Sequence, residues 1–382
     1  MVQLGEVVQI DRTSIQPDQI ADGQAYLGLE HIESGGRILR TGSVVAGELQ
    51  SSKFAFDKRH VLFGKLRPNL AKIARPDFSG ICSTDIVPLL PSNAIDRDYL
   101  AQFLLAPSTI AWAASRTAGV NLPRLSPSVL QSLDVPLPPL PEQRRIAEIL
   151  DRADELRAKR RRTLALLDEL SRSLFSTNFG SDHYGDATHE RFENVIAEMQ
   201  NGFYMPSSEY GSGTPILRIV DFAGGARLSL SNLSRVRAAI GDVERFVLAK
   251  GDLVVNRVNA MSHVGKSALV VQTPEKTIFE SNMMRIRLDR RRIYPEYALA
   301  WLNTDGARAQ IKSAAKQAIN QASVNQQDIA ALRLPIPSME AQRAYLSLNS
   351  VIGSLLEQEA SHLAKLDELF ASLQQRAFSG QL

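Results

Sequence analysis

The sequence predicts an α+β protein with two mixed α/β domains separated by two long helices, which pair as an antiparallel coiled coil about an internal pseudo-two-fold axis. One observation is a repeat: residues 133–179 match residues 332–378 without a gap at a constant offset of 199, which places Leu167 on Leu366. Another is that both stretches carry apolar stripes of heptad spacing, which is typical of long packed helices. A duplicated unit of this kind suits a pseudo-symmetric partner.

The first long helix follows a proline-rich run at 135–141, in which successive prolines exclude helix. Pro141 suits the first helical turn, Glu142 complements the helix dipole there, and Gly180 lies just beyond the expected end. The second helix keeps the same register and is expected to end at Gly380. We expect each helix to cover about 35 residues, or roughly 50 Å. The expected stripes are Ile146, Ile149, Leu150, Ala153, Leu156, Leu164, Leu167, Leu170 and Leu174, and then Tyr345, Leu348, Ile352, Leu355, Leu363, Leu366, Leu369 and Leu373.

The midpoints of the two helices carry opposite charge. Residues 157–162 read Arg-Ala-Lys-Arg-Arg-Arg, whereas residues 357–359 read Glu-Gln-Glu. Because each midpoint meets its counterpart in an antiparallel pair, we expect Arg160 to lie near Glu359, where a partly exposed ion pair selects orientation and contributes only a few tenths of a kcal/mol. The surplus arginines could instead face phosphate. Four leucines are assigned to the interhelical or partner-facing surface: Leu167, Leu170, Leu366 and Leu369.

The segments between the helices show short apolar, β-branched runs separated by turn residues, which predict strands. Each segment then has a helical stretch, at 98–105 and at 295–302, followed by Val120-Asn121 or Ile319-Asn320 in corresponding places. The whole unit is therefore duplicated, and these segments have diverged most. The expected strands are 7–10, 86–90, 216–220, 253–255 and 268–271.

The composition narrows the class of protein without naming a function. The chain of 382 residues is 44% hydrophobic, so it can bury a core, and its net charge of +3 permits nucleic-acid binding without requiring it. Cys82 is the only cysteine, which excludes a disulfide framework and fits a reducing compartment. Since the first residues lack a basic flank and a long apolar run, we expect a cytoplasmic protein with no signal peptide and no membrane span.

The candidate catalytic motifs lack residues or local structure that their chemistry requires. Gly265-Lys266-Ser267 resembles the end of a P-loop, but Ala260 stands where its first glycine belongs and a strand-like run follows it. The glycines at 211–213 are expected in a turn before Pro215, not in a dinucleotide-binding loop. There is no tetrapeptide of the adenine methyltransferase kind, which ends in Pro-Pro-Tyr or Pro-Pro-Phe. His183 and His189 are best explained as solvated linker residues, so we expect no catalytic residue, metal or cofactor in this chain.

Several stretches together carry a family resemblance. They are the Pro-Leu-Pro-Pro-Leu-Pro-Glu-Gln-Arg-Arg-Ile run at 136–146, the Leu-Asp-Glu-Leu repeats, Phe-Ser-Gly at 378–380, residues 61–70 with Cys-Ser-Thr-Asp at 82–85, and residues 251–257 with 264–266. Over essentially its full length the chain resembles the specificity subunit of type I restriction-modification systems. One departure is Ser-Met-Glu-Ala-Gln at 338–342, where the first copy has Pro-Leu-Pro-Glu-Gln, and it puts equal partner affinity at the two ends in doubt.

The resemblance implies a non-catalytic subunit with four segments. These are target recognition domain 1 (1–135), helical spacer 1 (136–180), target recognition domain 2 (181–334) and helical spacer 2 (335–382). It implies that the domains bind double-stranded DNA and that the helices set their separation, about one DNA turn or roughly 34–36 Å. It also implies docking of two modification subunits, which use S-adenosylmethionine to methylate adenine, and of restriction subunits with ATP- and Mg-dependent translocase and nuclease activity.

Candidate DNA contacts follow from side-chain chemistry, because Arg and Lys bond guanine, Asn suits adenine, and lysines meet phosphates. We select Arg67 and Arg257 first and take them to hold matching places in the two domains. Lys53 and Lys58 more plausibly meet phosphates, as does Lys266. The full candidate set is Lys65, Arg67, Asn69, Lys72, Asn201, Tyr204, Arg218, Asn256, Arg257 and Lys266.

Two other classes of protein remain open at this stage. One is a coiled-coil interaction scaffold whose end domains bind proteins, against which stand the paired basic loops and the proline-rich start of the first helix. The other is an enzyme with an unrecognised site, against which stands the absence of any constellation of nucleophile, base and orienting group. The DNA-binding hypothesis further predicts an asymmetric bipartite target, because the two domains have little sequence in common.

Overall fold

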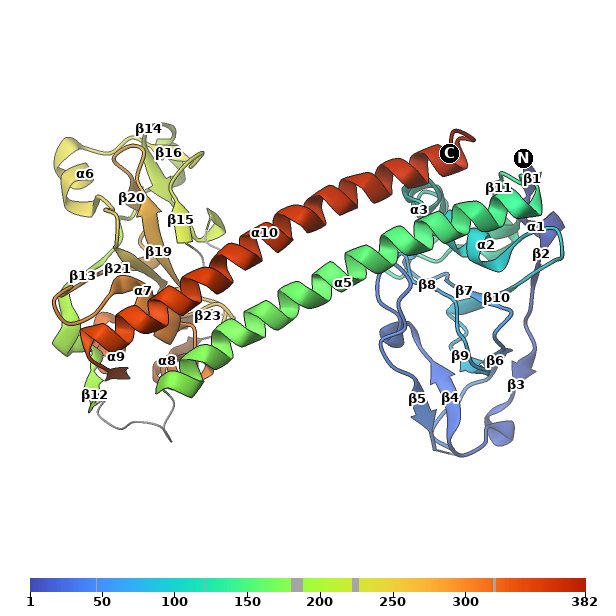
Figure 1. Ribbon diagram of the computed structural model, residues 1–382, viewed down its shortest axis with the longest axis horizontal. Coiled ribbons are helices and arrows are strands. Elements are labelled where there is room, and N and C mark those ends of the chain that lie inside the picture. Colours follow the sequence, from blue (N-terminus) through green and yellow to red (C-terminus); the bar gives the residue numbers. More distant parts are fainter. Residues whose placement is uncertain (46, 120, 180–187, 222–226, 319–320) are drawn as a thin grey trace. The chain divides into compact units, whose positions relative to one another are not determined.

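The computed structural model describes residues 1–382 except 46, 120, 180–187, 222–226 and 319–320 (Figure 1). The chain forms two compact units: unit 1 comprises residues 1–162 and 360–382, and unit 2 comprises residues 163–359. The long helices α5 (Leu140–Phe179) and α10 (Met339–Phe378) contribute to both units. Each has 40 residues, slightly more than expected. Several sequence predictions fall outside the described residues: Gly180, His183, Val120, Ile319 and Asn320.

Unit 1 is built on two larger sheets and the two-stranded β1–β11 sheet. A four-stranded antiparallel sheet has the order β2-β10-β7-β8, and a five-stranded sheet has the order β3-β6-β9-β4-β5, in which only the β4–β9 pair is parallel. The strands are β1 (Val2–Gln3), β2 (Val8–Ile10), β3 (Ser14–Ile15), β4 (Gln24–Leu27), β5 (Gly42–Val44), β6 (Lys53–Phe56), β7 (Val61–Gly64), β8 (Ile73–Ala74), β9 (Gly80–Cys82), β10 (Ile86–Pro91) and β11 (Asp134–Val135). The helices are α1 (Leu4–Val7), α2 (Arg97–Leu104), α3 (Pro107–Ala114) and α4 (Pro127–Gln131), with 3₁₀ turns η1 (Pro17–Gln19), η2 (Leu29–His31) and η3 (Pro68–Leu70).

Unit 2 has a similar arrangement of sheets, but its outer strands differ from those of unit 1. Its main sheet has the order β13-β21-β17-β19-β15, and the parallel β14–β20 pair corresponds to β4–β9. The strands are β12 (Thr188–Arg191), β13 (Ile196–Asn201), β14 (Tyr210–Leu217), β15 (Arg227–Ser229), β16 (Arg235–Val236), β17 (Leu253–Asn256), β18 (Val258–Asn259), β19 (Ser267–Gln272), β20 (Ile278–Phe279), β21 (Met283–Leu288), β22 (Lys316–Ala318), β23 (Gln321–Ser323) and β24 (Arg333–Ile336). The helices are α6 (Ile240–Phe246), α7 (Pro295–Leu302), α8 (Asp305–Ala314) and α9 (Gln326–Ala330), with η4 (Phe192–Val195), η5 (Ser207–Glu209) and η6 (Ile219–Asp221).

Four local predictions were wrong. His189 lies in strand β12, opposite Pro335 of β24, instead of in a linker. Val7 belongs to helix α1, because Leu4 and Val7 turn into the core one helical turn apart, and the strand begins only at Val8. The expected strand 216–220 ends at Leu217 and gives way to η6. The glycines at 211–213 lie within strand β14 instead of a turn; Gly211 and Gly213 take φ of +126° and +102°, and the strand's register with β16 shifts there.

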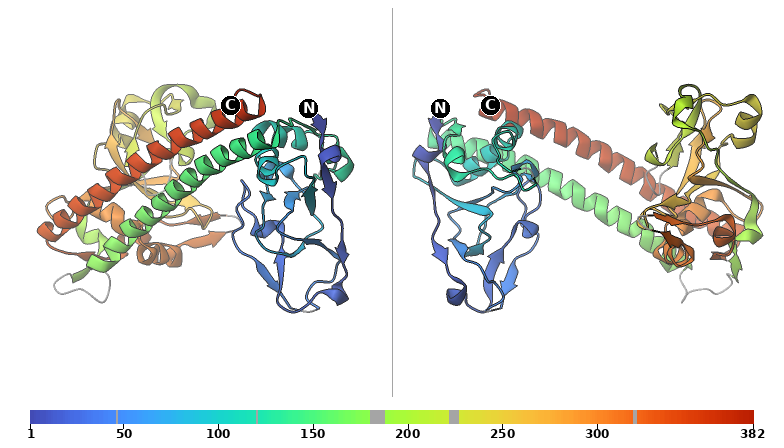
Figure 2. Two further views of the ribbon diagram at one scale, coloured as in Figure 1. Left: turned by 45° about the vertical axis from the view of Figure 1, so that its right-hand side comes forward. Right: turned by 180° about the vertical axis from the view of Figure 1, so that it is seen from behind.

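The two long helices pair antiparallel within each unit, as predicted. In unit 2 the Ser171 hydroxyl donates to Asn349 Oδ1 at 2.9 Å, and in unit 1 Arg157 Nε donates to Asp367 Oδ1 at 2.6 Å. Residue numbers therefore rise along one helix as they fall along the other, and Figure 2 shows the two helices running side by side in each unit. Arg160 and Glu359 belong to different units, so their proximity stays a prediction.

The duplication extends to single hydrogen bonds. The hydroxyl of Tyr99 donates to the Pro136 carbonyl at 2.9 Å, and that of Tyr297 donates to the Pro335 carbonyl at 3.1 Å. These bonds fasten α2 and α7 to the chain just before each long helix. Burial raises the pKa of Tyr99 above its ordinary value, so its hydroxyl stays a donor at neutral pH.

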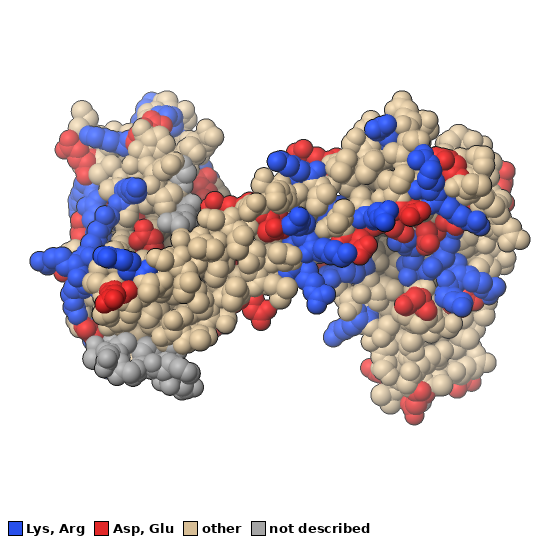
Figure 3. All heavy atoms as spheres, in the orientation of Figure 1, with Lys and Arg blue, Asp and Glu red and all other residues tan. Residues whose placement is uncertain are grey.

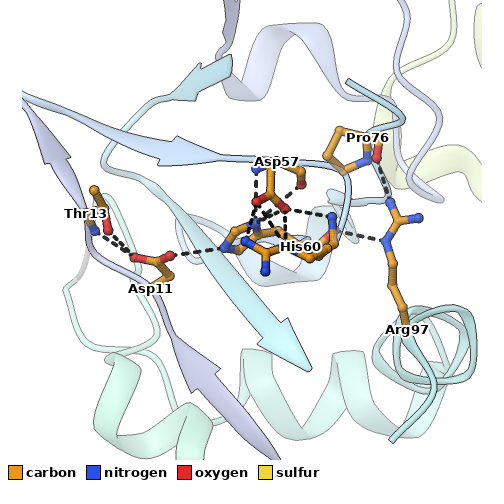
Figure 4. Close-up of polar contacts among 7 residues, drawn as sticks. Asp11, Thr13, Asp57, His60, Pro76 and Arg97 are labelled. Atoms are coloured by element: carbon orange, nitrogen blue, oxygen red, sulfur yellow. Dashed lines mark hydrogen bonds and ion pairs between the residues drawn. The ribbon is translucent and has the colours of Figure 1, made fainter. Parts of the chain in front are cut away.

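A polar cluster joins the strand ends of unit 1 (Figure 4). The buried His60 accepts the Asp57 backbone N–H at Nδ1 (3.0 Å), and its Nε2 lies 3.3 Å from Asp11 Oδ2. Hydrogen bonds from Arg59 hold the pKa of Asp57 well below its usual range, and a hydrogen bond from the Thr13 hydroxyl lowers the pKa of Asp11. The cluster ties the ends of β2 and β6 together.

Candidate nucleic-acid interface

A short turn occupies the same place in each unit, where the chain passes from the second strand of the parallel pair into an inner strand of another sheet, β10 of the four-stranded sheet in unit 1 and β21 of the five-stranded sheet in unit 2. In unit 1 this turn is residues 83–85, and in unit 2 it is residues 280–282; we call both the central turns. Each is fixed by the same bond: Ser83 N donates to the Leu27 carbonyl, and Glu280 N donates to the Leu217 carbonyl, both at 3.0 Å. The Cys-Ser-Thr-Asp stretch singled out in the sequence is therefore the central turn of unit 1 and the residue before it.

The strand beside each central turn delivers a basic residue to it. Lys65 N donates to the Asp85 carbonyl, and Arg257 N donates to the Asn282 carbonyl, both at 2.9 Å. The carbonyls of the same two residues accept from Leu125 and Val324, also at 2.9 Å.

Lys65 is therefore the counterpart of Arg257, and the expected match of Arg67 with Arg257 was wrong. The pairing of β7 with β10 and of β17 with β21 fixes the register: Gly64 lies opposite Ile86, and Asn256 lies opposite Met283. Lys65 and Arg257 are each the first residue after these strand ends, and the sequence alone did not align them.

Arg67 has an unusual backbone conformation. Its φ is +50°, in the left-handed region that a residue with a Cβ rarely adopts, and Ala71 follows with φ of +48°. The conformation is held because Arg67 N donates to the Pro123 carbonyl at 2.8 Å and its guanidinium donates to the Asn121 carbonyl at 3.3 Å. Arg67 and Asn69 are exposed.

The remaining unit 1 candidates differ in accessibility. Lys65 is partly buried. The Lys72 ammonium donates to the Leu29 carbonyl at 2.6 Å, so in this conformation it holds the loop backbone. Lys53 is buried and donates to Ser51, and burial lowers its pKa, whereas Lys58 is exposed. Arg124, which sequence reasoning missed, pairs with Asp85 of the central turn at 2.9 Å.

In unit 2 the candidates surround the central turn at different depths. Arg257 is half-buried, and its Nη1 donates to the Ser281 carbonyl at 3.1 Å. Asn256 is only 1% exposed, and its Oδ1 has no partner among the described residues. Tyr204 is 74% exposed, just past the Phe203–Glu280 bridge. Asn201, Arg218 and Lys266 are partly buried, and Arg218 lies over the Tyr210 ring at 5.5 Å.

Charge is distributed unevenly on the face shown in Figure 3. Basic side chains gather over unit 1 around α5, interleaved with acidic ones, while the unit 2 part of α10 presents few charges. That part carries Leu348, Val351 and Leu355, which are exposed, and Leu166 and Leu170 of α5 are exposed in the same unit. Leu170 and its repeat partner Leu369 are both about half exposed, whereas Leu167 and Leu366 are partly buried.

Neither a metal centre nor a membrane helix is present in the part of the chain that the structure describes. Within it, no group of three or more His, Cys, Asp and Glu side chains is placed to hold a metal ion. No described helix is both long and apolar enough to cross a bilayer. The structure therefore defines a protein of two divergent β-rich domains, each packed on the paired long helices and each with basic side chains around a central turn.

Comparison with known proteins gives the family. Residues 1–166 match the family described as type I restriction modification DNA specificity domain. The EcoKI specificity subunit of Escherichia coli K12 is 24% identical over 315 residues, which cover 77% of this chain and 67% of that protein. The EcoDI specificity subunit of Escherichia coli is 29% identical over 159 residues, 40% of this chain and 35% of that protein.

Two solved structures share the fold. One, from a study of assembly and conformational transition in a type I system, has 21% identity and a TM-score of 0.60 and covers 100% of this chain and 97% of its own. The specificity subunit of M. genitalium has 13% identity, the same TM-score and coverage of 99% and 95%. Residues 1–166 therefore belong to the type I restriction modification DNA specificity domain family, and over 77% of its length the chain is similar to a type I specificity subunit. It is a non-catalytic subunit that determines DNA target recognition.

Proposed function

We propose that this chain reads an asymmetric bipartite sequence in double-stranded DNA, with one half-site for each unit. The observation that carries the proposal is the pair of central turns: equivalent backbone bonds present Lys65 in unit 1 and Arg257 in unit 2, whereas the loops around them differ. Because the backbone that holds Lys65 and Arg257 is equivalent and the neighbouring loops differ, the two units suit half-sites of unlike sequence.

Within unit 1 the exposed side chains read the bases. Arg67 bonds guanine at O6 and N7, Asn69 bonds adenine, and Lys65 lies beside them. Lys58 meets phosphate, which strengthens binding without reading sequence. Lys72 is committed to the Leu29 carbonyl and keeps the loop in place.

Unit 2 reads its half-site through Arg257 and Tyr204, with Asn201, Arg218 and Lys266 around them. Arg257 is anchored at the central turn by its Nη1, so its guanidinium is preorganised for a base or phosphate. Asn256 supports this site from the interior of the unit, because its side chain is almost fully buried.

The helices dock two modification subunits, which supply S-adenosylmethionine and adenine methylation, and restriction subunits that use ATP and Mg. In support, Leu348, Val351 and Leu355 recur at helical spacing and are exposed in unit 2, as expected of a surface that a partner covers. The helices also set the separation of the two half-sites.

The test is to co-express this chain with its modification subunit and map methylated adenines across the host genome by single-molecule sequencing. We expect a split motif that disappears when this chain is omitted, and Arg67→Gln should relax one half of it while leaving the other intact. Methylation unchanged by omission of the chain, with no complex formed, would instead favour a protein-binding scaffold.

A further inference from the structure

Two exposed leucines stand beside Arg67 in unit 1. Leu70 is 40% exposed and Leu122 is 48% exposed, although both belong to short, well-fastened loops. Single exposed apolar residues are common on protein surfaces and need no explanation. Here, however, both are attached to the same strained residue, and that connection calls for a physical cause.

The attachments are hydrogen bonds between Arg67 and the backbone of the two loops. Leu70 N donates to the Arg67 carbonyl at 2.9 Å, which closes the η3 turn. Leu122 is flanked by the two residues whose carbonyls accept from Arg67, namely Asn121 from the guanidinium at 3.3 Å and Pro123 from the backbone N–H at 2.8 Å. Arg67 is therefore bonded to the backbone of both loops that carry these leucines.

The geometry also carries strain. Arg67 and Ala71 both occupy the left-handed region, at φ +50° and +48°, on either side of Leu70. Each such residue costs of order 1–3 kcal/mol and persists only where surrounding bonds enforce it. The bonds to Pro123 and Asn121 enforce it here and keep both leucines at the surface, which is opposite to what burial of apolar area favours.

We propose that Leu70 and Leu122 form an apolar surface that reads the C5-methyl group of a thymine beside the base bonded by Arg67. In the major groove thymine alone among the four unmodified bases presents a methyl group, and apolar side chains contact it. The inference rests on the proposed reading of DNA by unit 1. It adds thymine as the base that the two leucines select.

The experiment uses the complex assembled with its modification subunits. Arg67→Gln first identifies the half-site of unit 1. In the methylation map, L70S and L122S, singly and together, relax a thymine requirement at one position of that half-site and leave the other half-site unchanged. Val45→Ser is the matched control, since Val45 is 65% exposed in the same unit and makes no hydrogen bond with Arg67.

A binding measurement isolates the methyl group. Replacing that thymidine by deoxyuridine weakens binding of the unsubstituted complex about fourfold, the factor for burial of one methyl group, and does not change binding of the double variant. DNA carrying 5-methylcytosine there distinguishes two sources of the methyl: binding above that of cytosine DNA shows that the methyl is read on either base, and binding equal to cytosine DNA shows that thymine is required.

Three results would overturn the proposal: a motif unaffected by both substitutions, relaxation in the other half-site, or loss of complex formation together with methylation at both half-sites, which would make the leucines a protein contact. Each leaves the proposed function standing. A methylation pattern that does not depend on the chain at all would remove the proposed function itself.

Discussion

At the scale of single residues, two buried glutamines hold the start of each long helix. Gln143 Oε1 accepts from Asp96 N at 2.7 Å, and its Nε2 donates to the carbonyls of Ala94 and Pro138. Gln342 makes the corresponding three bonds in unit 2, to Tyr294, Arg292 and Pro337, each at 3.0 Å. Both side chains are fully buried, so these bonds cannot be exchanged for bonds to water.

Replacing Gln143 by leucine should lower the free energy of unfolding by about 1–3 kcal/mol, because it leaves a buried N–H and two buried carbonyls without partners. Gln342→Leu should cost a similar amount in the other unit. Urea unfolding of the purified chain measures both. The control is Gln375→Leu at an exposed position of α10, which should change stability by no more than about 0.5 kcal/mol. Equal midpoints for Gln143→Leu and the control would contradict the assigned role.

At the scale of elements, the long helices have two kinds of surface. The first fastens each helix to its own domain: in unit 1, Arg75 binds both carboxylate oxygens of Asp151 at 2.8 and 2.9 Å, and Gln102 donates to the same side chain at 2.6 Å. At the repeat offset of 199, Asp151 becomes Ser350, so unit 2 lacks this clamp. The second surface is an exposed apolar stripe, formed in unit 2 by Leu348, Val351 and Leu355 of α10.

Charge placed on that stripe should block docking. We expect Leu348→Glu with Val351→Glu to reduce capture of the modification subunit at least tenfold, because a carboxylate in an apolar interface loses its hydration without gaining a partner. Co-purification and titration of the modification subunit onto the tagged chain measure this. Ser350→Glu, at an exposed position of the same helix, should bind normally. Equal capture by all three chains would exclude this face as the docking surface.

At the scale of the whole molecule, each domain core is completed by a helix from the other half of the sequence. Phe378 of α10 packs on Tyr99 and Phe103 in unit 1, with ring centroids 5.7 and 5.3 Å apart. Phe179 of α5, its repeat partner, packs on Tyr297 in unit 2 at 5.1 Å. The chain is therefore an exchange of equivalent helices between two equivalent domains.

The fragment 1–179 should therefore form a symmetric dimer, since it has the first domain and lacks Phe378 but retains the equivalent Phe179, which a second copy can supply. Light scattering coupled to size-exclusion chromatography gives its mass. Phe179→Asp in the fragment should prevent dimerisation, because it places a charge in the acceptor site. A well-folded monomeric fragment would show that the α10 contact is not transferable to α5.

The sequence by itself determined the duplication, the two long helices and the composition of the loops. The reason is that heptad spacing and the positions of prolines are local signals. The helix at 295–302 and the strands beginning near Leu253 and Ile86 lie where the local pattern predicts them. The same local signals failed at Val7 and at 216–220, where a buried helical turn and a 3₁₀ turn replace the expected strands.

Only the tertiary structure decided which residues of the candidate site belong together. The match of Lys65 with Arg257 depends on strand register, and register is set by partners distant in the sequence, such as Ile86 and Met283. The prominence of Leu70 and Leu122 depends on the strained backbone of Arg67, which no composition or spacing reveals. The periodicity of apolar residues depends on positions close together in the sequence. Strand register, side-chain burial and backbone strain depend on contacts between segments that are distant in the sequence.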